Sequence, residues 1–144
     1  MKHSEYILTY RKLVRPEDLN HANSLFGGTL LSWADEAAAM YSMCQIGSKS
    51  VVTLKMGEVL FKNPSYSGDI LEFWTRRSKI GNSSIGVDCI IVRKEINGPQ
   101  DIPTPPVKTK EGEFENERDI ILSCEFIFVH VDELGKPKAH GINS

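Results

Sequence analysis

The stretch from Gly27 to Cys44, GGTLLSWADEAAAMYSMC, decides the fold of this chain. Apolar or small residues recur in it at the three-and-four spacing of one helical face: Gly27, Leu30, Leu31, Ala34, Ala37, Ala38 and Tyr41. A glycine pair opens the segment, and Gly47 follows it where a helix commonly stops. Because alanine lets a neighbouring backbone approach closely, we expect a long helix buried against a sheet.

Most of the remaining sequence is typical of β-strands, being rich in β-branched and aromatic residues between Gly, Pro, Asn and Ser. The predicted strands are Tyr6 to Leu13, Val51 to Phe61, Asp69 to Ser78, Ser83 to Lys94 and Ile120 to Val131. The gap around Gly81-Asn82 suits a hairpin and leaves no room for a crossover helix, which indicates antiparallel pairing. The predicted fold class is α+β, with one long helix laid across a curved antiparallel sheet of about five strands. One helix covers little of such a sheet, so we expect a homo-oligomer.

The composition indicates one globular domain over residues 1–144, with 40% hydrophobic and 25% charged residues. The segment 98–119 contains four prolines followed by a charged run and is interpreted as an exposed loop. A formal net charge of -2 gives no field that attracts nucleic acid. The sequence shows no apolar signal region and no run as long as a membrane span, so we expect a cytoplasmic protein without nucleic-acid or membrane partners.

The usual strong catalytic signatures are absent from the sequence: Gly-x-Ser-x-Gly, a Walker loop, His-Glu-x-x-His and paired Cys-x-x-Cys. The four histidines are scattered without metal-ligand spacing, so neither a metal nor a cofactor is expected. Cys44, Cys89 and Cys124 are far apart and lie in apolar stretches, which favours buried free thiols. Any catalysis must therefore rest on carboxylates, amides and the backbone.

Asp35 is the outstanding carboxylate of the sequence. At 100° per residue it borders the apolar stripe of the predicted helix, two turns from Gly28, whereas Glu36 points to nearly the opposite side. Partial desolvation beside Trp33 and Ala34 would make Asp35 a stronger general base than a carboxylate in water. The alternative is a structural carboxylate or an interface residue.

Gly27 and Gly28 offer a second chemical feature at the start of the helix. The N–H groups of a first helical turn are unpaired and carry the positive end of the macrodipole, so they can polarise a carbonyl or stabilise an oxyanion. Glycine also lets a substrate carbonyl approach without a Cβ atom in the way. The alternative is that the pair only starts the helix or permits close packing.

The sequence resembles the acyl-CoA hydrolase branch of the hotdog-fold thioesterases. The resemblance is carried by Asp18-x-Asn20, Phe26-Gly27-Gly28, Trp33-Ala34-Asp35-Glu36-Ala37-Ala38, Val51-Val52-Thr53, Phe61-x-x-Pro64-x-x-x-Gly68-Asp69, Arg76, Gly81-Asn82-Ser83-Ser84 and Val131-Asp132-x-x-Gly135-Lys136-Pro137. It covers most of residues 6–138 with order and spacing preserved. Two features depart from the family pattern: Asn23 stands where glycine is frequent, and the segment from Pro99 to Asp119 is longer than expected.

That resemblance implies a hotdog fold, a dimer or trimer of dimers, and active sites at the dimer interface. It implies that Asp35 is the catalytic carboxylate, that Asn20 supplies an amide from across the interface, and that the Gly28 N–H polarises the thioester carbonyl. It further implies that substrate or coenzyme A contacts Gly27, Thr53, Arg76, Ser83 and Ser84. Coenzyme A would be part of the substrate rather than a cofactor.

The predicted activity is hydrolysis of acyl-CoA thioesters, with Asp35 acting as general base or as nucleophile. Acyl-chain contacts are expected among Leu30, Trp33, Phe61 and Trp74, and phosphate contacts among Arg76, Arg77 and Lys79. Two alternatives remain open at this point. A hotdog hydratase or dehydratase would need a His beside a carboxylate, for which His21 is the nearest candidate, and a non-catalytic acyl-CoA-binding module would keep the same cradle.

Overall fold

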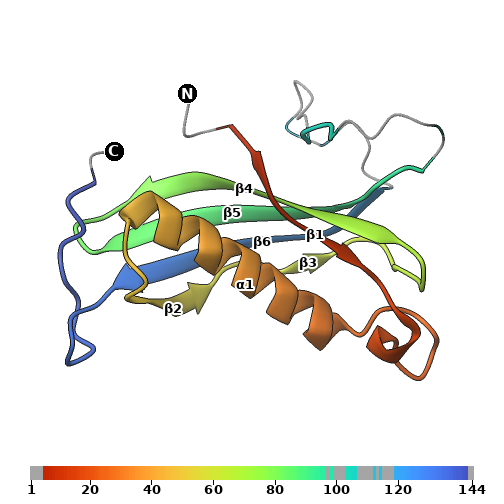
Figure 1. Ribbon diagram of the computed structural model, residues 1–144, viewed down its shortest axis with the longest axis horizontal. Coiled ribbons are helices and arrows are strands. Elements are labelled where there is room, and N and C mark those ends of the chain that lie inside the picture. The colour runs from red at the N-terminus through yellow and green to blue at the C-terminus, as the bar shows by residue number, and fades with distance from the viewer. Residues whose placement is uncertain are drawn as a thin grey trace.

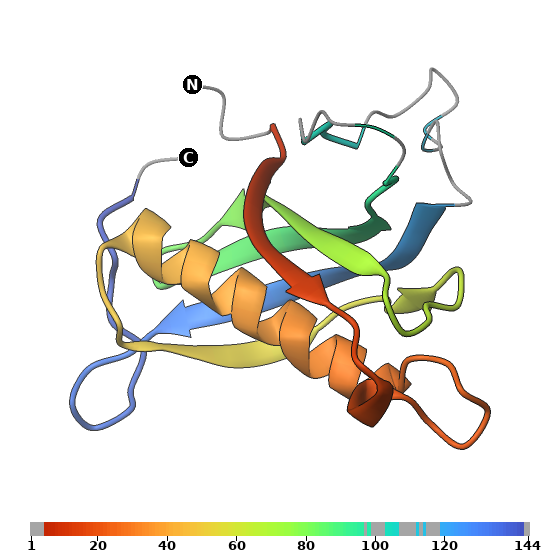
Figure 2. The same cartoon turned by 45° about the vertical axis from the view of Figure 1, so that its right-hand side comes forward.

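The computed structural model describes residues 5–96, 98, 103–106, 112, 114 and 119–142. In chain order the elements are β1 (Ile7–Leu13), the short 3-10 helix η1 (Pro16–Asp18), α1 (Gly27–Ile46), β2 (Val51–Met56), β3 (Leu60–Phe61), β4 (Ile70–Ile80), β5 (Ser84–Arg93) and β6 (Ile120–His130). Figures 1 and 2 show α1 lying diagonally across one face of a curved sheet. The α+β class predicted from the sequence is confirmed.

The sheet has the strand order β1-β4-β5-β6-β2, every pair is antiparallel, and β3 pairs with β6. The predicted hairpin joins β4 to β5, where the Gly81 N–H donates to the Ser84 carbonyl over 3.1 Å. The single strand predicted from Val51 to Phe61 is wrong, because it is divided into β2 and β3 around residues 57–59. At this break the Gly57 N–H bonds to the Glu125 carbonyl, which keeps the segment beside β6, and the sheet has six strands rather than five.

Helix α1 starts at Gly27, as predicted, and ends at Ile46, two residues beyond the predicted end. Gly47 stops it in a left-handed conformation with φ of 76°, and its N–H donates to the Met43 carbonyl over 2.7 Å. Among the described residues, no helix is both long and apolar enough to cross a membrane.

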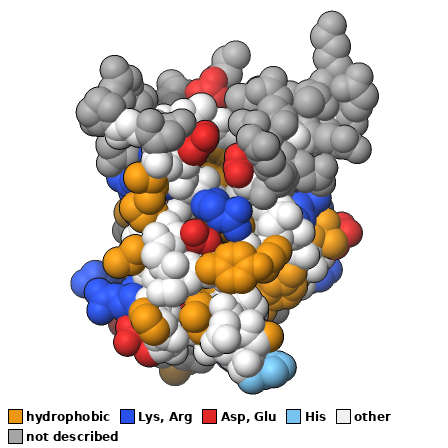
Figure 3. Space-filling view, turned by 90° about the vertical axis from the view of Figure 1, so that its right-hand side faces the viewer, with side chains coloured by type: hydrophobic (Ala, Val, Ile, Leu, Met, Phe, Trp, Pro, Cys, Tyr) orange, Lys and Arg blue, Asp and Glu red, His pale blue; other side chains and the backbone are white. Residues whose placement is uncertain are grey.

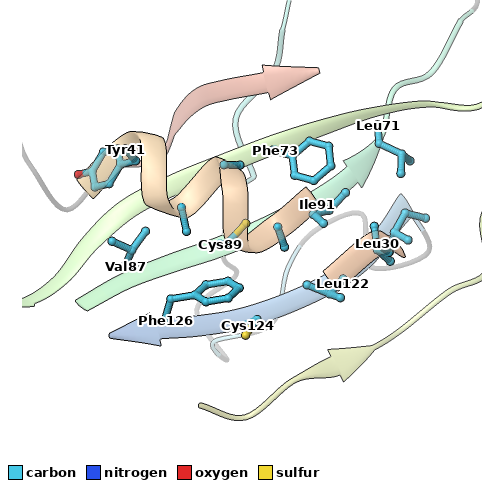
Figure 4. Packing of buried hydrophobic residues seen from close by; sticks show 14 of the residues in the cluster. Leu30, Tyr41, Leu71, Phe73, Val87, Cys89, Ile91, Leu122, Cys124 and Phe126 are labelled. Atoms are coloured by element: carbon cyan, nitrogen blue, oxygen red, sulfur yellow. The ribbon is translucent and has the colours of Figure 1, made fainter. Parts of the chain in front are cut away.

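The core lies between α1 and the sheet (Figure 4), where Phe73, Ile91, Leu122 and Phe126 are fully buried beneath the helix. Each such side chain contributes about 1.5–3 kcal/mol by leaving water. Ala34, Ala37 and Ala38 are 0% exposed, so the predicted close approach of helix and sheet is confirmed.

Two of the three cysteines lie in this core. Cys89 and Cys124 are buried and stand directly opposite each other on β5 and β6. Cys44 is exposed, so the prediction that all three thiols are buried is wrong for this residue. The cause is that the last buried position of α1 is Ser42, and Cys44 falls beyond it in the final turn.

Candidate active site

Asp35 lies in the middle of α1, partly exposed, next to the fully buried Ala34, while Glu36 points into solvent. One carboxylate oxygen, Oδ1, accepts a hydrogen bond of 2.8 Å from the Thr53 hydroxyl. Thr53 belongs to β2, the last strand of the sheet order, and stands at an irregularity in the pairing of β2 with β6. The carboxylate is thereby fixed at the edge of the sheet.

The charge of the Asp35 carboxylate affects the pKa of a buried thiol, that of Cys124. Burial, followed by the negative charges of Asp35 and Glu125, raises the pKa of Cys124 from 9.0 to about 11. Cys124 is 5% exposed and belongs to the core beneath α1. Asp35 therefore stands close above β6, at the boundary between core and solvent.

The start of α1 presents free backbone donors. The first hydrogen bond of the helix runs from the Leu30 N–H to the Phe26 carbonyl at 3.0 Å. No acceptor is recorded for the Gly27 and Gly28 N–H groups in the part of the chain that the structure describes. An added Cβ at Gly28 would lie 2.8 Å from the Phe26 ring, so glycine permits this position of the ring. Such donors can stabilise an oxyanion.

Asn20 lies in the loop before α1, where its side chain closes a turn. Its Oδ1 accepts from the Ala22 N–H at 2.8 Å and from the Ser24 N–H at 3.3 Å. These bonds fix the orientation of the amide, and no acceptor is recorded for its nitrogen among the described residues. Asn23 in the same loop has a φ of 62°, a left-handed geometry that asparagine accepts more readily than most residues.

Within one chain, Asp35 and Gly28 do not form a single contact site. Seven residues of helix separate them by about 10 Å along the axis, although they lie on the same side. The bond to β2 turns Asp35 toward the sheet edge. We define two half-sites in the chain: the helix start with Gly28, together with the preceding loop that carries Asn20, and the sheet edge, where Asp35 is bonded to Thr53.

The other predicted site residues lie elsewhere. Ser83 and Ser84 form the β4–β5 hairpin, and the Ser83 carbonyl accepts from the His130 N–H at 2.7 Å. Arg76 forms a 3.0 Å ion pair with Asp88 and lies 4.5 Å from the centre of the Tyr6 ring.

The basic group predicted near the hairpin does not form one cationic surface. Arg77 Nη2 bonds to Gln45 of α1 at 2.5 Å, on the helix side of the sheet. Arg76, its neighbour in β4, points to the opposite face because side chains alternate along a strand. The two arginines therefore do not present one joint surface, and contact of this basic group with phosphate stays a prediction.

The four predicted acyl contacts also separate. Leu30 and Phe61 line a cavity of about 290 Å³ next to Gly27. The Trp33 ring centre instead lies 5.3 Å from the Lys12 ammonium nitrogen. Trp74 is buried but does not belong to the core beneath α1, because it follows Phe73 directly in β4 and so points to the opposite face of the sheet. Only two of the four are positioned around a common cavity.

The sequence did not predict the hydrogen bond between Thr53 and Asp35. The family resemblance implied only that Thr53 contacts substrate or coenzyme A. The sequence predicted the burial of Cys124 but not its proximity to Asp35, since the spacing along a strand does not show which helical residue lies above it. His21 is exposed, and the described ranges record no hydrogen bond or ion pair between it and a carboxylate. Nor do they contain three His, Cys, Asp or Glu side chains placed to hold a metal ion.

Comparisons with known proteins agree with this geometry. Residues 22–99 match the thioesterase superfamily. The chain is 28% identical over 131 residues to the acyl-CoA thioester hydrolase YciA of Salmonella typhimurium, covering 91% of this chain and 87% of that protein.

Two solved structures are similar as well. The hexameric hotdog-fold thioesterase Cj0915 of Campylobacter jejuni superposes with a TM-score of 0.69 at 25% identity, covering 96% of this chain and 92% of that one. The Staphylococcus aureus acyl-CoA hydrolase, solved with butyryl coenzyme A and coenzyme A, superposes with a TM-score of 0.71 at 31% identity, covering 90% and 68%.

A long helix wrapped by a single antiparallel sheet, with a carboxylate on the helix at the sheet edge, defines this chain as a hotdog-fold thioesterase. The match to the family profile spans more than half of the chain. The chain belongs to the thioesterase superfamily.

Proposed function

We propose that this protein hydrolyses acyl-CoA thioesters to coenzyme A and a carboxylic acid, as one domain spanning residues 1–144. The single observation that carries the proposal is the Asp35 carboxylate held by Thr53 at the open edge of the sheet. The relatives named acyl-CoA hydrolases support coenzyme A thioesters as the substrate class. Coenzyme A then enters as part of the substrate, and no separate cofactor is required.

In the proposed reaction, the Gly28 N–H polarises the thioester carbonyl while Asp35 takes a proton from water. The water oxygen bonds to the carbonyl carbon, and the resulting oxyanion is stabilised at the start of α1. The carbon–sulfur bond then breaks, and the departing thiolate takes up the proton that Asp35 received. In the nucleophilic variant, Asp35 attacks the carbonyl and expels the thiolate, and water then cleaves the mixed anhydride.

We infer from the separation of the two half-sites that a second copy of the chain completes the site. Strand β2 is a sheet edge with exposed apolar side chains: Val52 is 49%, Leu54 66% and Met56 40% exposed. An unpaired apolar edge is a template for pairing with another strand. We infer that two copies join through β2, so that Asp35 of one protomer faces Gly28 of its partner. Assembly of such dimers into a hexamer, the state of the C. jejuni relative, is part of this proposal.

The role of Asn20 is supported by a spacing in the S. aureus relative. Structures exist for an asparagine-to-alanine and an aspartate-to-alanine variant of that enzyme, and the two substituted positions are fifteen residues apart. Asn20 and Asp35 have the same separation. We infer that Asn20, oriented by its turn, holds the attacking water or the thioester beside the partner's carboxylate.

Coenzyme A contacts at Gly27, Ser83, Ser84 and Arg76 stay predictions, and for Arg76 the ion pair with Asp88 weakens the case. The cytoplasmic location and the loop at 98–119 also stay predictions. Most of that segment lies outside the described residues.

The test is incubation of purified protein with a panel of saturated and enoyl-CoA thioesters, with release of coenzyme A followed by a thiol-trapping dye. We expect release of the free thiol from saturated acyl-CoAs. Hydration of the enoyl substrates without thiol release, or saturable binding without turnover, would overturn the proposal in favour of a hydratase or a binding module.

A further inference from the structure

A cavity lies at the start of α1. It measures about 290 Å³, and its walls include Leu25, Leu30, Phe61, Pro64 and Ile121, with Gly27 at its rim. Figure 3 looks at this end of the molecule, where hydrophobic side chains are exposed between polar surface. The cavity adjoins the free N–H groups that would hold the thioester carbonyl.

The polar side chains around the cavity are already engaged within the protein. Asn63 Nδ2 donates to the Ile120 carbonyl at 2.6 Å, and the Ser65 hydroxyl donates to Asp69 at 2.9 Å. A ligand entering here would therefore contact mainly aliphatic and aromatic surface. An apolar group of the substrate fits that surface, whereas the phosphorylated end of coenzyme A would lose hydration without gaining partners.

Phe61 controls the rim of this cavity. It lies on the two-residue strand β3, is 55% exposed, and its ring faces Gly27 so closely that an added Cβ would lie 3.3 Å from the ring. A ring at this position narrows the opening, and the absence of a side chain at Gly27 keeps it open. The cavity volume is roughly twice that of a 150 Å³ void known to hold a benzene molecule.

We propose that the acyl chain of the substrate enters this cavity, and that Phe61 is the specificity-determining residue that gives a preference for short and medium chains. This inference rests on the proposed thioester hydrolysis. The carbonyl stays at the Gly28 N–H, the hydrocarbon chain extends past Gly27 toward Leu30 and Ile121, and Phe61 closes over it. Long chains exceed the available volume.

The test compares kcat/KM on acetyl-, butyryl-, octanoyl-, lauroyl- and palmitoyl-CoA for the wild type, Phe61→Ala, Gly27→Ala and the double variant. Removing the ring should raise the lauroyl-to-butyryl ratio about tenfold, the lower end of the discrimination that a single methylene gives in an apolar pocket. The added methyl group of Gly27→Ala should lower the octanoyl-to-acetyl ratio about tenfold. The double variant should recover most of that loss, because the methyl and the ring compete for the same space.

Tyr66→Ala is the matched control, since Tyr66 is also a half-exposed aromatic, at 50%, but does not line the cavity. Its chain-length ratios should equal those of the wild type. Ratios that stay within twofold in every cavity variant overturn the inference while leaving hydrolysis intact. If Phe61→Ala alters the assembly in light scattering, Gly27→Ala decides alone, because it removes no edge contact.

Binding of non-hydrolysable alkyl-CoA thioethers, measured by calorimetry, separates this inference from the proposed function. Affinity should increase with chain length up to the same limit, and Phe61→Ala should move that limit to longer chains. A protein that binds the thioethers in this way but releases no coenzyme A from any thioester would overturn the hydrolysis and retain the cavity assignment. Affinity independent of chain length would overturn the cavity assignment.

Discussion

The Thr53 hydroxyl donates a 2.8 Å hydrogen bond to Oδ1 of Asp35, and this contact ties the middle of α1 to the edge strand β2. No hydrogen bond is recorded for the second carboxylate oxygen, Oδ2, among the described residues. Because β2 is also the edge through which a second copy would pair, the same contact joins the proposed catalytic group to the proposed interface.

Removal of the Asp35 carboxylate should abolish most turnover. We expect Asp35→Ala and Asp35→Asn to lower kcat by at least about a hundredfold, the scale typical of acid–base groups. Glu36→Gln is the matched control, because Glu36 is the neighbouring carboxylate and points into solvent. Circular dichroism should show native folding of all three variants. Turnover of Asp35→Asn within fivefold of the wild type would contradict the assignment.

The Thr53 hydroxyl should act by positioning Asp35. Thr53→Val keeps the shape of the side chain but removes a hydrogen bond worth about 0.5–1.5 kcal/mol, so we expect kcat to fall by roughly twofold to tenfold with little change in KM. Thr53→Ser retains the donor and should restore kcat. If serine and valine are equally impaired, the hydroxyl does not position the carboxylate.

The backbone donor at Gly28 can be tested by proline. The first turn of a helix tolerates proline, which removes the N–H without requiring an intrahelical partner. We expect Gly28→Pro to lower kcat by about a hundredfold to a thousandfold, as for the loss of one oxyanion donor. Gly28→Ala keeps the N–H and meets only the movable ring of Phe26, so it should lose far less. Equal activity of the two variants would exclude this donor.

A positive charge on the edge strand β2 should dissociate the assembly and abolish most of the activity. Leu54 on β2 is 66% exposed, and lysine on an edge strand opposes strand pairing. We expect Leu54→Lys to sediment as a smaller species and to lose most of its kcat, since each site needs both protomers. Leu134→Lys is the control, because Leu134 is 82% exposed in a turn. A fully active monomer would contradict a shared site.

The buried thiol of Cys124 should make stability fall at alkaline pH. Its pKa is raised from 9.0 to about 11 by burial, so the folded state favours the protonated thiol. This stabilisation is complete below pH 9 and is lost as the pH rises from 9 toward 11, by on the order of 2 kcal/mol.

Urea unfolding of wild type and Cys124→Ala at pH 8 and pH 10.5, with reductant present, measures this effect. The drop in unfolding free energy between the two pH values should be smaller in the variant. Comparing each protein with itself cancels the cost of the shortened side chain. An equal drop in both proteins would show that the thiol does not contribute.

Local features of this protein were predictable where neighbouring residues decide them. The start of α1 at Gly27, the stop at Gly47, the β4–β5 hairpin and the exposure of Glu36 relative to Asp35 follow from periodicity and from glycine geometry. The errors concern packing at a distance. Cys44 lies in an apolar stretch typical of the core, but it falls beyond the last buried turn of the helix. The segment from Val51 to Phe61 has the composition of one strand, but it is broken where Gly57 bonds to β6.

The sequence by itself determined that a small-residue helix would pack on an antiparallel sheet and that Asp35 would lie at the margin of its buried stripe, because residues a few positions apart fix both. Only the tertiary structure decided that Thr53 meets Asp35 and that Phe61 rather than Trp74 borders the cavity beside Gly27. These contacts join residues far apart in the chain, and they depend on strand order and on how each strand lies beside its neighbour, which residues a few positions apart do not fix.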